Sequence, residues 1–273
     1  MTSYVFPYKL HDPEQKLILP DVLREISGIT LTDLDNFACV NDEMGVVYIY
    51  SISENSVLKQ FSFADSGDYE DITRVENSLY VLRSDGVITE IMNFNSEGRT
   101  VKSYSTQIPA KNNEGLCYDE KNHRLLIACK SKSGTDKGAK DFRAVWGFDI
   151  TEKKLSEKPI YLFELKAIRE FASQKDIVIT NKSKDDNTEE VQEIKMKSSA
   201  ISIHPVTEDI YILSASEFLL FVIDKLGVIK HIEPLDKQLF KKAEGLTFYP
   251  NGDMLISNEG VNEKPSIYIF KYN

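Results

Sequence analysis

The chain has 273 residues, of which 43 are acidic and 33 basic, so its formal net charge is -10. Hydrophobic residues make up 41% and charged residues 28%, which is typical of a soluble globular protein with a large core. The acidic excess argues against a nucleic-acid-binding protein, because phosphate backbones are bound by clustered lysine and arginine. No segment reaches the ~20 apolar residues that a membrane-spanning helix needs. We expect a monomer whose surface suits a cationic partner.

A short phrase with a central aliphatic residue recurs five times along the chain. These aliphatic residues, separated by 43, 44, 85 and 45 positions, are Ile29, Ile72, Leu116, Ile201 and Leu246. A period near 44 residues is typical of β-propeller blades. Four copies are followed by three further strand-like runs each, and the last copy by two. The pattern predicts an all-β protein: a single domain, residues 1–273, built as a propeller of five four-stranded blades.

The last predicted blade lacks its outer strand. The N-terminal segment Gln15–Pro20 has strand character, and we expect it to complete that blade and close the ring. The 85-residue spacing keeps six blades as an alternative, since it is nearly twice the repeat. However, residues 166–197 contain only one β-like run, 176–180, after a helix-like stretch at 165–172. We interpret 166–197 as an insertion between blades three and four.

Polar residues occur at two equivalent positions in every predicted blade. In a propeller, the start of the innermost strand and the end of the second strand meet on one face. The start positions are occupied by Glu25 to Ser27, Glu70, Glu114, Ser199 and Glu244. The end positions are occupied by Asn41 to Glu43, Arg83 to Asp85, Lys130, Ser214, Asn258 and Glu259. Four of the five blades therefore contribute acidic side chains to one channel mouth.

Several carboxylates around one axis repel one another unless a cation compensates them. Oxygen ligands favour calcium or magnesium, and no histidine or cysteine falls in the ring, which argues against zinc and against a Ser-His-Asp triad. We expect calcium to be held by Glu70, Glu114, Glu244, Asp42 and Glu259. We expect a small-molecule or protein ligand to contact Glu25, Asn41, Arg83, Lys130 and Asn258. Arg83 and Lys130 have two interpretations: pairing with Glu70 and Glu114, or capture of an anionic group.

A set of phrases in this order resembles the SdiA-regulated family of bacterial proteins. The phrases include Glu25-Ile26-Ser27-Gly28-Ile29, Val40-Asn41-Asp42-Glu43-Met44-Gly45, Tyr80-Val81-Leu82-Arg83-Ser84-Asp85-Gly86, Asn113-Glu114-Gly115-Leu116-Cys117-Tyr118-Asp119, Glu244-Gly245-Leu246-Thr247-Phe248 and Leu255-Ile256-Ser257-Asn258-Glu259-Gly260. The likeness runs from about residue 17 to 272. It implies a five-bladed propeller, distantly similar to NHL-repeat propellers, with a calcium site and no settled activity. Members are often exported or lipid-anchored, whereas the present N-terminus has no signal-peptide pattern, so the compartment stays open.

Two classes of function remain. The first is a non-enzymatic calcium-binding propeller that binds a ligand or partner at its ring face. The second is a metal-dependent hydrolase, lactonase-like or phytase- and esterase-like, in which a channel cation activates water. A catalytic base beside the metal would favour the second class, and the sequence places no histidine there. We favour the first class.

Overall fold

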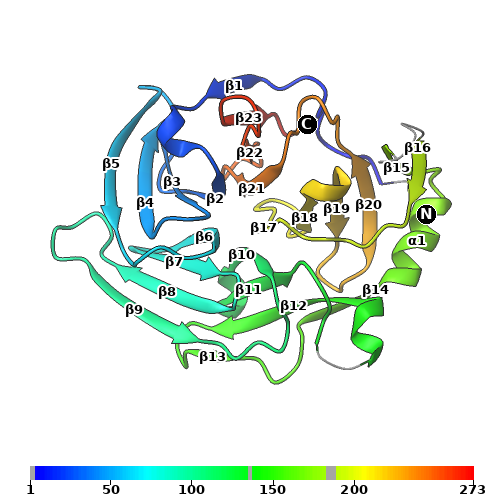
Figure 1. Ribbon diagram of the computed structural model, residues 1–273, viewed down its shortest axis with the longest axis horizontal. Coiled ribbons are helices and arrows are strands. Elements are labelled where there is room, and N and C mark those ends of the chain that lie inside the picture. Colours follow the sequence, from blue (N-terminus) through cyan, green and yellow to red (C-terminus); the bar gives the residue numbers. More distant parts are fainter. Residues whose placement is uncertain (1–3, 135–136, 183–188) are drawn as a thin grey trace.

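The computed structural model describes residues 4–134, 137–182 and 189–273. Figure 1 shows five antiparallel sheets arranged in chain order around a common centre. The predicted all-β propeller with five blades is therefore confirmed, and the six-bladed alternative is wrong. Among the helices of the described chain, none combines the length and apolar character that a bilayer crossing requires.

Each blade is a four-stranded meander, and three blades follow this pattern without interruption. Blade one consists of β2 (Ile26–Leu31), β3 (Asn36–Asn41), β4 (Val46–Ser51) and β5 (Ser56–Ser62). Blade two consists of β6 (Tyr69–Val75), β7 (Ser78–Arg83), β8 (Val87–Met92) and β9 (Thr100–Ser105). Blade four consists of β17 (Ala200–Ile203), β18 (Ile210–Ser214), β19 (Leu219–Ile223) and β20 (Ile229–Pro234).

The other two blades each have an unusual outer strand. Blade three consists of β10 (Asn113–Asp119), β11 (Arg124–Cys129), β12 (Phe142–Asp149) and an outer strand in two pieces, β13 (Lys154–Leu155) and β14 (Tyr161–Glu164). Blade five consists of β21 (Ala243–Phe248), β22 (Met254–Asn258), β23 (Ser266–Phe270) and the N-terminal β1 (Gln15–Ile18). β1 pairs antiparallel with β23, which confirms the predicted ring closure.

The hydrophobic core consists of five clusters, one at each junction between neighbouring blades. Each sheet faces a neighbour on both sides, so its inner strands read as nearly continuous buried runs, as in Leu219–Ile223 and Met254–Asn258. The three cysteines are buried in these runs as free thiols, in agreement with their apolar sequence context.

The innermost strands approach so closely that some positions exclude a side chain. A Cβ atom on Gly28 of blade one would lie 2.5 Å from the Cα of Asp71 in blade two. The buried Asp71 carboxylate in turn accepts a hydrogen bond of 2.6 Å from the backbone N–H of Leu116 in blade three. The close approach at Gly28 and the hydrogen bond to Asp71 thus link blades one, two and three near the axis.

The segment between β14 and β17 contains α1 (Leu165–Ser173) and a hairpin of β15 (Ile179–Lys182) and β16 (Glu189–Gln192), outside blade four in Figure 1. The sequence interpretation included the helix but only one of the two strands. The segment contributes Ile168, Ile194 and Met196 to the core between blades three and four.

Candidate functional site

A β-bulge occurs at the same place in four of the five innermost strands. The pairing register shifts at Ser27–Gly28, Glu70, Glu114 and Glu244. A bulge leaves one residue outside the regular ladder and re-aims its side chain, and bulges are frequent next to binding sites. The three glutamates predicted to begin the innermost strands are therefore the residues that the bulges release from the ladder. In blade four β17 pairs with β18 without a shift.

The released glutamates face a cavity of about 270 Å³ at the channel mouth. We call it the acidic cavity. Its lining comes from blades one, two, three and five and consists of Ser27, Asp42, Asp68, Glu70, Asn112, Glu114, Lys130, Lys242, Glu244 and Glu259. Six carboxylates and two lysines therefore share one concave surface.

Two of the six carboxylates are neutralised by the two lysines. Lys130 Nζ lies 2.6 Å from Glu114 Oε1, and Lys242 Nζ lies 2.5 Å from Glu259 Oε1. Burial lowers the pKa of Lys130, but the Glu114 carboxylate outweighs burial, and the net shift is upward. The same holds for Lys242 beside Glu259. The cavity wall thus already binds two ammonium groups.

Glu70 and Glu244 have neither a hydrogen bond nor an ion pair from their carboxylates within the described part of the chain. Burial, followed by the charge of Glu114, raises the pKa of Glu70 to about 9. Burial, followed by Glu114 and Glu259, raises the pKa of Glu244 to about 8, and the Glu244 residue is only 8% exposed. Both side chains are therefore mostly protonated at neutral pH when no cation is present.

Asp42 also lines the cavity, and one of its carboxylate oxygens is buried with no hydrogen-bond partner among the described residues. Burial, followed by the charge of Glu25, raises its pKa. All five residues expected to hold calcium line this one cavity: Glu70, Glu114, Glu244, Asp42 and Glu259.

The residues expected to contact a ligand are more scattered, and only Lys130 lines the acidic cavity. Asn41 accepts hydrogen bonds from the backbone N–H groups of Glu43 and Met44 and so caps a turn. Arg83 is held by Asp85 of its own turn, with Nη2 2.8 Å from Oδ2, rather than by Glu70. Lys130 does pair with Glu114, as the first interpretation proposed.

The other two of these residues, Glu25 and Asn258, do not line the acidic cavity. Glu25 is exposed and has a left-handed backbone with φ 61°. Asn258 is buried, and both polar atoms of its amide lack a partner among the described residues. It lines a separate small cavity of about 70 Å³ instead.

Three cavity residues were not identified from the sequence: Asp68, Asn112 and Lys242. Each precedes a bulged glutamate by two positions, and Lys197 precedes Ser199 of blade four in the same way. The signal was therefore present in the repeat, at the position two residues before each start of the innermost strand.

No group of three or more His, Cys, Asp or Glu side chains within the described residues has the spacing of a metal site. The expected calcium therefore stays a prediction. All four histidines lie elsewhere; His204, for example, is buried against Tyr8, and burial lowers its pKa to about 4.

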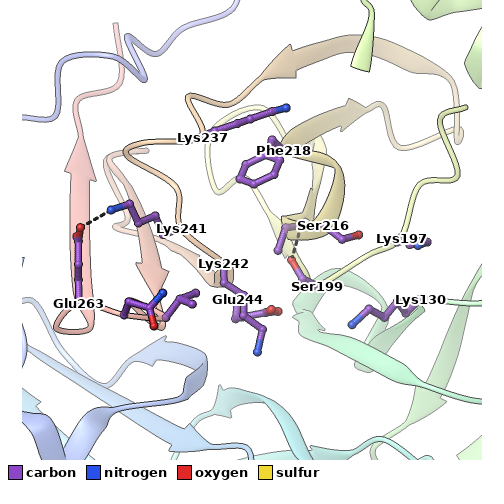
Figure 2. Close-up of a pocket in the computed structure, with 13 residues that line it drawn as sticks. Lys130, Lys197, Ser199, Ser216, Phe218, Lys237, Lys241, Lys242, Glu244 and Glu263 are labelled. Atoms are coloured by element: carbon purple, nitrogen blue, oxygen red, sulfur yellow. Dashed lines mark hydrogen bonds and ion pairs between the residues drawn. The ribbon is translucent and has the colours of Figure 1, made fainter. Parts of the chain in front are cut away.

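A second and larger cavity, of about 470 Å³, adjoins the acidic cavity over blade four (Figure 2). We call it the lysine pocket. The two cavities share Lys130, Lys242 and Glu244. The channel mouth is therefore divided into two parts of different charge.

No protein-family model matches the chain, and no curated protein does either. Among solved structures, it is similar to the glutaminyl cyclase of Myxococcus xanthus, with a TM-score of 0.60, 11% identity and 96% of both chains covered. It is similar to a chain of the mitotic checkpoint complex, with a TM-score of 0.51, 9% identity, and 97% of this chain and 93% of that one covered. It is also similar to streptogramin B lyase, with a TM-score of 0.50, 13% identity, and 95% and 97% covered. At these identities the likeness shows the shared propeller fold alone.

Proposed function

We propose that this protein is a binding propeller whose acidic cavity holds the cationic group of a small ligand or protein partner. One observation carries the proposal: six carboxylates and only two lysines line a cavity of about 270 Å³. Within the described residues, four of these carboxyl groups have no lysine partner, and a positively charged ligand would favour their ionised form.

A primary ammonium group suits this cavity best. Glu114 and Glu259 already bind lysine ammonium groups at 2.6 and 2.5 Å, while the carboxylates of Glu70 and Glu244 remain available. An ammonium ion has three donors and can bridge two carboxylates by charge-assisted hydrogen bonds. A ligand amine would thus repeat, at Glu70 and Glu244, the contacts that the protein's own lysines make.

Calcium is the second candidate for the cavity. It is favoured by repulsion among the carboxylates, since the charge of Glu114 raises the pKa of both Glu70 and Glu244 after burial does. A divalent cation would relieve that repulsion, although calcium needs six to eight oxygen ligands. No three carboxylates of the described chain have that spacing now, so calcium would require these side chains to change rotamer.

We also propose that the chain is a relative of the SdiA-regulated propellers. This proposal rests on the ordered phrases around Glu114, Glu244 and Asn258. A metal-dependent hydrolase is supported less well, because the residues lining the acidic cavity include no histidine as a catalytic base.

The test is a calorimetric titration with benzylamine, which carries one ammonium group, against benzyl alcohol as its neutral counterpart. Benzylamine should bind and benzyl alcohol should not. Glu244→Gln removes a carboxylate and keeps the shape, so it should weaken binding about tenfold or more, in line with the strength of a charged hydrogen bond. Glu97→Gln is the matched control, because the Glu97 side chain is 94% exposed and lies outside the cavity. Equal binding of the amine and the alcohol, or equal affinities of the two variants, would refute the proposal.

A further inference from the structure

The lysine pocket differs from the acidic cavity in its charge and in the apolar residues of its lining. Its lining consists of Lys130, Lys197, Ser199, Ala215, Ser216, Phe218, Lys237, Lys241, Lys242, Glu244, Val261, Asn262 and Glu263. Five lysines and two glutamates thus surround it on a chain whose net charge is -10. A local excess of positive charge on an acidic protein is typical of an anion-binding site.

Three of the five lysines are already paired with carboxylates: Lys130 with Glu114, Lys242 with Glu259 and Lys241 with Glu263. Within the described residues, Lys197 and Lys237 have no carboxylate partner. Lys237 Nζ donates a hydrogen bond to the backbone carbonyl of Thr180 and lies over the face of the Phe218 ring, 5.5 Å from its centroid. Two positive charges in the pocket are therefore available to a ligand.

Phe218 gives the pocket an aromatic surface. It follows η4 (Ala215–Glu217) and has a left-handed backbone, φ 54° and ψ 49°, which is rare for a bulky residue. The backbone N–H of Phe218 donates to the Ala215 carbonyl, and its backbone carbonyl accepts from the N–H of Leu235. These two hydrogen bonds stabilise the left-handed conformation. Figure 2 shows the half-buried ring within the pocket, beneath Lys237. Strained residues of this kind concentrate at binding sites.

We propose that the lysine pocket is a second binding site, for a planar aromatic anion. The ring of the ligand would stack on Phe218, and its carboxylate or phosphate would bind Lys197 and Lys237. The volume of about 470 Å³ falls within the range of small-molecule pockets. Ala215 and Val261 supply apolar contact beside the lysines.

The experiment uses the full chain and calorimetric titration with benzoate and phenyl phosphate as probes. Benzyl alcohol is the neutral counterpart and inorganic phosphate the anion without a ring. At least one aromatic anion should bind more tightly than both of these controls, and the stronger of the two identifies the anionic group. The double variant Lys197→Gln/Lys237→Gln should weaken that binding at least about tenfold, as loss of charged hydrogen bonds requires. Lys154→Gln is the control, because Lys154 is exposed and lies outside the pocket.

Phe218→Leu tests the ring separately from the charge. It keeps apolar bulk and the same backbone requirement but removes the stacking surface, so aromatic anions should lose several-fold in affinity while inorganic phosphate is unchanged. The proposal is overturned if neither aromatic anion binds at millimolar concentration, or if the double variant binds as the Lys154→Gln control does. Benzylamine binding to the double variant reports on the acidic cavity independently, since neither Lys197 nor Lys237 lines that cavity.

Discussion

The acidic cavity and the lysine pocket adjoin each other at one channel mouth but differ in charge. Blades two, three and five place a bulged glutamate at the start of the innermost strand, whereas blade four has Ser199 and an unbroken ladder. The Ser199 hydroxyl donates to the Ala243 carbonyl at 2.9 Å and accepts from Ala215 N–H. Blade four therefore adds no carboxylate at this position, and both glutamates that line the lysine pocket belong to blade five. The residue at this repeated position therefore decides whether a blade adds a carboxylate to the channel mouth.

The largest expected effect concerns the bulges themselves. Gly28→Ala would place a Cβ 2.5 Å from the Asp71 Cα and the Ile72 nitrogen, both backbone atoms. We expect a loss of about 3 kcal/mol in the free energy of unfolding, the upper range for overpacking a core. Blade four already has Ala200 at the equivalent position, so Ala200→Gly should cost only about 1 kcal/mol. Urea denaturation of both variants measures the difference, and equal losses would show that the bulged blades are not packed more tightly.

The next effect is a pH dependence of stability. The pKa of Glu244 is raised from 4.5 to about 8 in the folded state. The folded protein therefore holds a proton that the unfolded chain releases, and this stabilisation is complete below pH 4.5 and is lost as pH rises toward 8. Glu244→Gln mimics the protonated form. Its advantage over the wild type in the free energy of unfolding, measured by urea denaturation, should be near zero at pH 4 and should grow steadily up to pH 8. Glu97→Gln should follow the wild type, and a constant difference for Glu244→Gln across this range would contradict the raised pKa.

Cation binding should strengthen with pH for the same reason. An ammonium group needs the ionised form of Glu244, so benzylamine must displace a proton below pH 8. We expect its affinity to rise between pH 6 and pH 8, by at most about tenfold per pH unit for each proton released, and Glu70, with a pKa of about 9, can release a second one. Titration in buffers with different ionisation enthalpies would count that proton. The Glu244→Gln variant should show a flatter profile, and an identical slope would assign the proton to another group.

The smallest expected effect is that of calcium on thermal stability. If the carboxylates bind calcium, millimolar calcium should raise the melting temperature by about 2–4 °C, by linkage with the folded state. Glu114→Gln and Glu244→Gln should each reduce this shift, whereas Glu97→Gln and magnesium serve as controls. Chelator should reverse it. No shift in the wild type would leave the ammonium as the cation of this cavity.

The sequence was sufficient for the architecture because the propeller repeats. The spacing of Ile29, Ile72 and Leu116 located the innermost strands, and the missing outer strand of the last blade identified β1 as the closing strand. The same reasoning placed Glu70, Glu114 and Glu244 at one face, where they line one cavity. The period of the repeat specifies which strand ends meet on one face, and the predictions of the blades and of the glutamate positions needed only that information.

The partners of individual side chains could not be obtained in this way. Arg83 pairs with Asp85 because Gly86, with φ 87°, turns the chain sharply after them, and a strand register contains no information about such a turn. Asn41 likewise caps its own loop. The lysine pocket was missed because Phe218 and Lys237 lie outside the two positions that the repeat brings together.

The closure of blade five has a consequence for how the chain acquires its structure. The two strands that pair, β1 and β23, lie about 250 residues apart in the chain. Until β23 emerges, β1 has no edge to join, and the edge of the growing propeller stays open to other chains. The final step of folding must therefore join the two ends of the sequence across a long loop, which predicts slow completion after the earlier blades have formed. Until this last pairing forms, the open sheet edge can still pair with another chain.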